Sequence, residues 1–173
     1  MNNCMDVIRS RSSVKKYISK EIPSELIDRV IEAGLCAASG RNLQAPIIVA
    51  VTNKEIRDKL SAANAAVMGA TGDPFYNAPA VLVVLADKSA HTYVYDGSLA
   101  LGNMMLAAHE AGLGSCWIHR AKEVFEQSEW KEWLRSIGVT ADVEGIGNLV
   151  LGYPDGERPA PKERKPGRVF KVR

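Results

Sequence analysis

The stretch GNMMLAAHEAGLGSCWI, residues 102 to 118, decides the fold. Its first half belongs to an apolar run, DGSLALGNMMLAAHEAG, at residues 96 to 112. This run predicts a helix that is apolar nearly all round and rich in Ala, Gly and Met. Such a helix belongs in the centre of a core or in a subunit interface. Residues 115 to 118, which follow it, are predicted to form a short strand.

Further apolar runs on both sides of this stretch predict the remaining elements. The β-branched runs at 47–51 and 80–86, and the run GIGNLVLG at 145–152, predict three more strands. Apolar positions at helical spacing predict helices over 23–36, with Pro23 as its first residue, and over 54–67 and 122–137. Helices and short strands in mixture indicate an α+β or mixed α/β fold, with one layer of sheet covered by helices.

Length and composition limit the class of protein. A chain of 173 residues is a single-domain length, and its net charge of +2 is too small for a general nucleic-acid-binding surface. No run of eighteen apolar residues predicts a membrane span, and the first ten residues do not resemble a secretory signal. Three widely spaced cysteines indicate free thiols in a reducing cytoplasm, without a disulfide framework or a zinc site.

Positive charge is concentrated at the two ends of the chain. Residues 9–20 hold five bases and no acid, and residues 157–173 hold seven bases against two acids, whereas residues 21–156 hold ten bases and seventeen acids. Because chain ends often lie close together, the two basic ends could form one anion site. The alternative is that both are solvated tails. The residues that suit a phosphate group there are Arg11, Ser12, Ser13, Arg164 and Lys165.

Four other features of the sequence bear on its chemistry. The glycine pairs at 112–114 and 145–147 lack the strand, turn and helix order of a dinucleotide fingerprint, which excludes a Rossmann fold. The amides of Asn42 and Gln44 either recognise a flat heterocycle or serve as a helix cap and a surface residue.

Cys116 and His119 stand three apart in a predicted strand, so their side chains point to opposite faces. This favours a packing role for Cys116 over a nucleophilic one. His109, which lies among alanines, is expected to be a core or interface histidine.

Five segments of the sequence stand out, in this order: RSSVKKY (11–17), SGRNLQAP (39–46), NAPAVLVVLAD (77–87), GNMMLAAHEAGLGSCWI (102–118), and LVLGYP (149–154) followed by Lys162, Arg164, Lys165 and Pro166. Taken together, they resemble the motifs of the nitroreductase-like flavoprotein family. The sequence departs from the family pattern at Ala45-Pro46, where the family has Pro-Trp, and at Ala38, where it has proline.

The resemblance implies an α+β, nitroreductase-like fold, with a central, mostly antiparallel sheet flanked by helices, in an intertwined homodimer. Residues 1–173 would form one domain, and residues 153–173 an extended basic tail that packs on the partner subunit or the flavin phosphate. It also implies an FMN-dependent oxidoreductase that takes hydride from NAD(P)H. A small organic acceptor, such as a nitroaromatic or a quinone, would receive the electrons in a ping-pong cycle without a catalytic protein nucleophile.

The same resemblance assigns the cofactor-binding residues. Lys15 would lie near the ribityl chain or the pyrimidine edge, and Asn42 and Gln44 would meet the flavin ring. The backbone of the predicted strand would run along the ring, and the basic ends would hold the phosphate. The strand residues are Ser115, Cys116, Trp117 and Ile118, and the phosphate residues are Arg11, Ser12, Ser13, Lys162, Arg164 and Lys165.

Three alternatives stay open. One is a family relative with dehalogenase or flavin-cleaving chemistry, and another is a non-catalytic flavin-binding or storage protein. The third is a cofactor-free thiol enzyme that uses Cys116.

Overall fold

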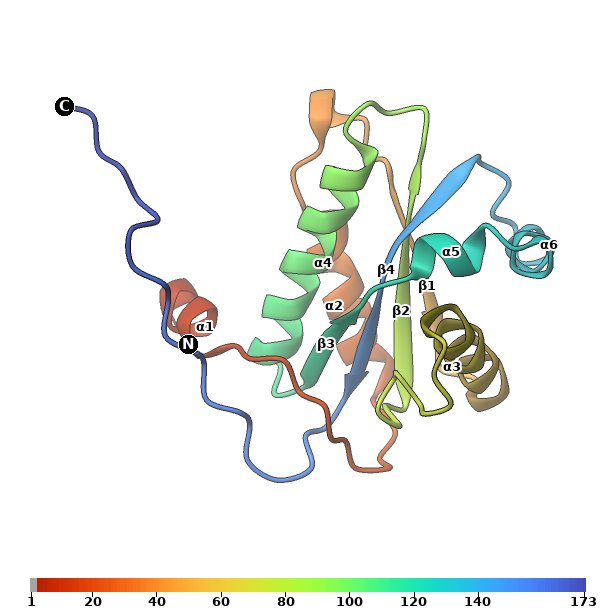
Figure 1. Cartoon of the computed structure of the whole chain (residues 1–173), viewed down its shortest axis with the longest axis horizontal. Helices are drawn as coiled ribbons and strands as arrows, with labels where there is room; N and C mark the ends of the chain where they lie inside the picture. Colours follow the sequence, from red (N-terminus) through yellow and green to blue (C-terminus); the bar gives the residue numbers. More distant parts are fainter. Residues whose placement is uncertain (1–2) are drawn as a thin grey trace.

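A four-stranded sheet forms the centre of the protein. The computed structural model describes residues 3–173 and orders the strands β1-β2-β4-β3, with every neighbouring pair antiparallel (Figure 1). β2 and β4 occupy the middle because both are nearly continuous apolar runs that are buried on two faces. The predicted antiparallel sheet is confirmed. The strands are β1 (Pro46–Val51), β2 (Ala80–Asp87), β3 (Gly114–Ile118) and β4 (Val143–Gly152).

Helices cover both faces of this sheet (Figure 1). α2 and α4 pack on one face, and α3, α5 and α6 pack on the other, so that two apolar cores form with the sheet between them. α1 lies apart from the sheet, beside the end of α4. The helices are α1 (Cys4–Ser10), α2 (Ser24–Leu35), α3 (Lys54–Met68), α4 (Tyr93–Glu110), α5 (Ala121–Phe125) and α6 (Ser128–Ser136), with a 3-10 turn at Gly40–Asn42.

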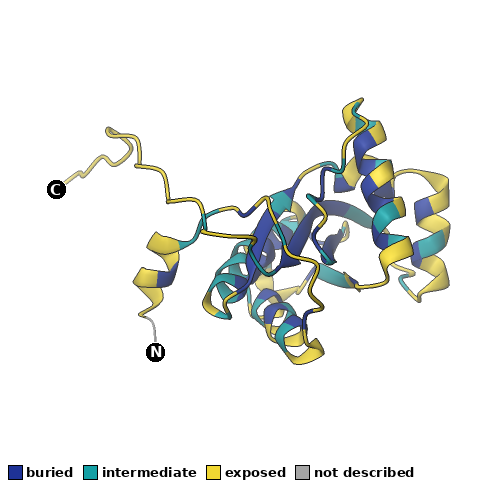
Figure 2. Cartoon of the chain, turned by 90° about the horizontal axis from the view of Figure 1, so that it is seen from below, coloured by how far each residue is buried: buried dark blue, intermediate teal, exposed yellow. Residues whose placement is uncertain are grey.

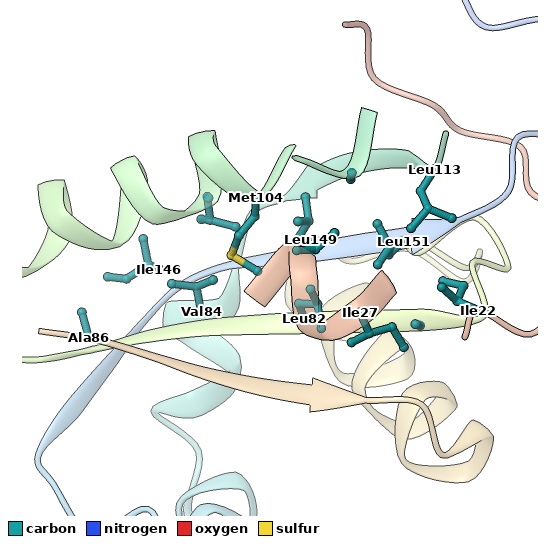
Figure 3. Packing of buried hydrophobic residues seen from close by; sticks show 14 of the residues in the cluster. Ile22, Ile27, Leu82, Val84, Ala86, Met104, Leu113, Ile146, Leu149 and Leu151 are labelled. Carbon is teal, nitrogen blue, oxygen red and sulfur yellow. The ribbon is translucent and has the colours of Figure 1, made fainter. Parts of the chain in front are cut away.

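The long helix α4 is a core helix on one side. Met104 is fully buried and packs in the same cluster as Leu149 and Leu151 of β4 (Figure 3). A Cβ atom on Gly97 would lie 2.6 Å from Cγ1 of Ile146, so glycine is required for the close approach of α4 to the sheet. The other side of α4 leaves Tyr95 and Leu99 72% and 52% exposed.

Two of the predicted helices differ from the structure, and a further helix was not predicted. The predicted helix at 122–137 is two helices, α5 and α6, because the backbone is extended at Gln127, with a ψ of 143°. This turn of the chain lets the ring of Phe125 pack against that of Trp133, with the ring centres 6.4 Å apart. Pro23 is the residue before α2, with an extended ψ of 139°, and not its first helical residue. Helix α1 was not predicted, since only Val7 of its seven residues is buried.

The C-terminal segment leaves the body of the protein. Residues 161–173 are exposed throughout and extend past α1 (Figure 2). None of the helices within residues 3–173 has the length and apolar character that crossing a membrane requires.

Candidate functional site

The basic segment at residues 11–17 lies beside β3, at one edge of the sheet. The amide of Val14 donates to the carbonyl oxygen of Ser115 at 3.0 Å, and the Val14 side chain is buried. A Cβ atom on Gly114 would lie 2.8 Å from the Val14 Cβ, so only glycine permits this approach. The Tyr17 hydroxyl donates to the Val14 carbonyl oxygen at 2.6 Å and fixes the end of the segment.

This docking brings predicted site residues from two parts of the chain together at Cys116. Burial raises the pKa of the Cys116 thiol, and Ser13, Lys15 and Arg11 lie close enough to lower it in part. The Sγ atom donates to the Trp117 carbonyl oxygen at 3.7 Å. The thiol is therefore held in its protonated form, which disfavours a nucleophilic role.

Two polar atoms of the segment are buried without a partner. Nη1 of Arg11 and Oγ of Ser12 have no hydrogen-bond partner among residues 3–173. Leaving a buried guanidinium N–H or hydroxyl unpaired costs free energy, so these atoms are suited to an external acceptor. A phosphate group offers several anionic oxygens and fits this donor set.

His109 and Arg158 extend the cluster of bases. His109 is half-buried in the last turn of α4, where its Nε2 lies 2.8 Å from Oγ of Ser10 and its Nδ1 contacts Nη1 of Arg158. Burial lowers the pKa of His109, and the charges of Arg158 and Arg11 lower it further. No ion pair within the described residues includes Arg11 or Arg158. The result is a positive cluster with no carboxylate partner.

Sequence reasoning did not assign His109 or Arg158 to the site. Arg158 is one of the seven bases at 157–173, and nothing in the spacing of these bases indicates which of them turns inward. His109 was expected to be a core or interface histidine, and the structure places it half-buried in the last turn of α4. The only feature of the sequence that pointed to a site with Arg158 in it is the excess of bases over acids at both ends of the chain.

The predicted phosphate residues of the tail are not brought to Arg11 within one chain. Lys162, Arg164 and Lys165 are exposed, and no hydrogen bond or ion pair joins them to other residues of the described part. Their assignment to a phosphate therefore stays a prediction.

Asn42 and Gln44 lie at the opposite end of α4. The Gly40 amide, in the same turn, donates to Asp96 Oδ1 at 3.1 Å, near the start of α4. His109 follows Asp96 by thirteen residues, a distance of about 20 Å along a helix. Asn42 and Gln44 are exposed, have positive φ angles of 56° and 50°, and their amides lie 3.3 Å apart. α2 ends at Leu35, so Asn42 does not cap it.

A cavity of about 890 Å³ lies elsewhere, between residues 17–24 and the start of α3. Lys20, Lys54 and Arg57 are among the residues that line it. Among the described residues that line this cavity is Tyr17, at the end of the basic segment, but none of those predicted to bind the cofactor.

Comparison with known proteins identifies the family. The model of the Nitroreductase family matches residues 8–73 and 67–153, and the chain belongs to this family. An NADPH-flavin oxidoreductase of Vibrio harveyi is 29% identical, over 98% of this chain and 72% of its own. An FMN reductase [NAD(P)H] of Bacillus subtilis is 25% identical, over 96% of this chain and 71% of its own.

A solved structure agrees with this assignment. The nitroreductase with bound FMN from Bacteroides fragilis matches with a TM-score of 0.87 and 28% identity, and the match covers 100% of both chains. The predicted nitroreductase-like fold is confirmed.

Proposed function

We propose that this nitroreductase-family protein, an NAD(P)H-dependent flavin oxidoreductase, binds FMN and reduces a small organic acceptor such as a nitroaromatic or a quinone. NAD(P)H and the acceptor would occupy the same site in turn, in a ping-pong cycle. The observation that carries the proposal is the pair of buried, unpartnered donors, Arg11 Nη1 and Ser12 Oγ, in a cluster of bases without an acid.

The phosphate of FMN would be held by this cluster. Arg11, Ser12 and Ser13 offer a guanidinium and two hydroxyls on a segment that β3 holds in place. Lys162, Arg164 and Lys165 would add charge from the extended tail. The tail at 153–173 would become ordered against the flavin phosphate or against a partner subunit, as expected for a segment that has no apolar periodicity of its own.

The flavin ring would lie along β3. Lys15 is exposed and its Nζ stands 5.6 Å from the centre of the Tyr76 ring, on the side of the segment that faces solvent. A cation at this position would stabilise negative charge on the reduced flavin ring. The backbone of Ser115 to Ile118 would run beside the ring and orient it.

Asn42 and Gln44 would come from a second copy of the chain. They lie about 20 Å from the phosphate cluster of their own chain, measured along α4. The exposed apolar residues of α4, Tyr95 and Leu99, provide a surface that a second copy can cover. A homodimer would then contain two sites, each built from both subunits.

The chemistry divides between cofactor and protein. FMN, when bound, supplies the hydride acceptor and donor that no side chain provides. The protein residues bind its phosphate, orient its ring and place a cation beside it. A protonated, buried Cys116 supports this division over a thiol mechanism.

The absorbance spectrum of the purified protein tests the proposal. Bound flavin gives two bands, in the near-ultraviolet and in the blue, and initial rates with NAD(P)H and a quinone should give parallel double-reciprocal lines. Protein that is colourless and takes up no added FMN would contradict the proposal. Binding of FMN without faster NAD(P)H oxidation than free FMN gives would indicate a flavin-storage protein.

A further inference from the structure

His109 is held as a neutral ring with its proton on Nε2. The Ser10 hydroxyl donates to the carbonyl oxygen of Asp6 at 2.6 Å, so its oxygen is left to accept from His109 Nε2 at 2.8 Å. On the other side of the ring, a guanidinium has only donors, so Nδ1 must accept from Arg158. An imidazole that accepts a hydrogen bond at Nδ1 carries no proton there.

The charges around His109 explain why the ring stays neutral. Arg158 faces it from the tail and Arg11 from the basic segment, and both disfavour a further positive charge. From α1 it meets the uncharged Ser10 hydroxyl. On α4 the next residue, Glu110, is paired with Arg29 of α2 at 2.6 Å. No carboxylate among the described residues therefore compensates the two guanidinium groups.

We propose that His109 is a proton-linked ligand of the FMN phosphate. This rests on the proposed function, because the phosphate is the anion that the cluster lacks. When the dianion enters, Arg158 turns from Nδ1 to a phosphate oxygen, and Nδ1 takes a proton from solvent. His109 then carries a positive charge beside the phosphate, and its bond to Ser10 is kept.

The sign of the pH dependence follows from linkage. Burial and two guanidinium groups lower the pKa of His109 in the free protein, whereas an adjacent dianion raises it. FMN binding therefore takes up protons, and FMN affinity falls as pH rises. The affinity for FMN should be measured above pH 7. The second pKa of a phosphate monoester is about 6, so at lower pH the titration of the FMN phosphate itself dominates the pH dependence. One linked proton changes the Kd by at most about tenfold per pH unit.

Calorimetric titration of the apoprotein with FMN at pH 7.5 tests the proposal without mutation. The binding heat in buffers of different ionisation enthalpy gives the number of protons taken up, and we expect a substantial fraction of one proton. Riboflavin, which lacks the phosphate, should bind without this uptake. In His109→Gln the uptake should vanish, and the Kd for FMN should change less between pH 7 and 8.5.

The matched control is His91→Gln, because His91 is an exposed histidine in the loop before α4. This variant should keep the uptake of the parent protein. FMN binding without proton uptake, or equal uptake in His109→Gln, would overturn the inference and leave the proposed function intact. Failure of the parent protein to bind FMN at all would overturn both.

Discussion

Val14 and Gly114 pack so closely that a Cβ atom at Gly114 would stand 2.8 Å from the Val14 Cβ. This contact holds the basic segment at residues 11–17 on the edge of the sheet, next to β3. Two chain segments about one hundred residues apart thus form one surface. The unpartnered donors of Arg11 and Ser12 lie at the start of the basic segment.

Replacing Gly114 by alanine should lift this segment from β3. Backbone-anchored Val14 cannot move freely, so we expect Gly114→Ala to weaken FMN binding by about tenfold or more, a cost of 1–3 kcal/mol typical of overpacking. Fluorescence titration of FMN measures it. Gly72→Ala is the control, because an added Cβ there meets nothing within 4 Å. Equal affinities in both variants would show that the segment does not hold the cofactor.

Removal of the tail charges tests the predicted phosphate contacts. A hydrogen bond to a charged group contributes about 1.5–3 kcal/mol, so Arg164→Ala with Lys165→Ala should raise the Kd for FMN by tenfold or more. The affinity for riboflavin should not change. Arg168→Ala with Arg173→Ala removes the same charge from the same tail and serves as the control. Unchanged FMN affinity in the first pair would make the tail a spectator.

A charge on the exposed face of α4 should prevent dimerisation. Leu99 is 52% exposed in the single chain and would be covered in a homodimer, where a buried carboxylate is strongly unfavourable. Leu99→Asp should therefore elute as a monomer in size-exclusion chromatography with light scattering, and should lose FMN. Met68→Asp, at a 48% exposed site at the end of α3, should stay dimeric. A dimeric Leu99→Asp variant would exclude this face as the interface.

Substitution of Cys116 separates the flavin mechanism from a thiol mechanism. Because burial raises the pKa of this thiol, it is a poor nucleophile at neutral pH. Cys116→Ser should change kcat for NAD(P)H-dependent quinone reduction by less than about tenfold, or about 1.4 kcal/mol in the activation free energy. Complete loss of activity in a folded, FMN-loaded variant would favour the thiol enzyme.

Asp73 should make stability depend on pH in the acid range. Burial raises the pKa of its carboxyl group, but hydrogen bonds from Ser61, Arg57 and the amides of Asn77 and Phe75 outweigh burial and lower it below 3.8. A group with a lowered folded pKa stabilises the protein above its unfolded pKa. This stabilisation is lost as the pH falls through the folded pKa.

Asp73→Asn should therefore lower the free energy of unfolding at pH 7. We expect a decrease of about 1–2 kcal/mol in the free energy of unfolding. This lies at the low end of what hydrogen bonds to a charged group contribute, because the carboxylate is partly solvated. The variant should also show a shallower decline below pH 4, measured by urea unfolding at several pH values. Asp155→Asn, at an exposed carboxylate, is the control. An unchanged acid slope in Asp73→Asn would contradict the assignment.

The strands and the long helices could be predicted from the sequence because each is a strong apolar pattern. The burial of β2 follows directly from its continuous apolar run, whereas α4 could be predicted as a helix but not which of its apolar residues stay exposed. The break between α5 and α6 could not be predicted, because the ring contact of Phe125 with Trp133 is tertiary. The inward turn of Arg158 toward His109 likewise depends on where α4 ends relative to the tail. Asn42 and Gln44 were predicted as ring contacts, but their distance from Arg11 depends on the length of α4.

The eighteen-residue length of α4 has a consequence for mixed assemblies. If the two ends of each α4 helix lie at different sites of the dimer, every polypeptide contributes residues to both catalytic centres. A population of chains defective only at Arg11 and another defective only at Asn42 would each be inactive alone. Subunit exchange between them would create heterodimers with one doubly damaged centre and one intact centre, so activity would reappear on mixing.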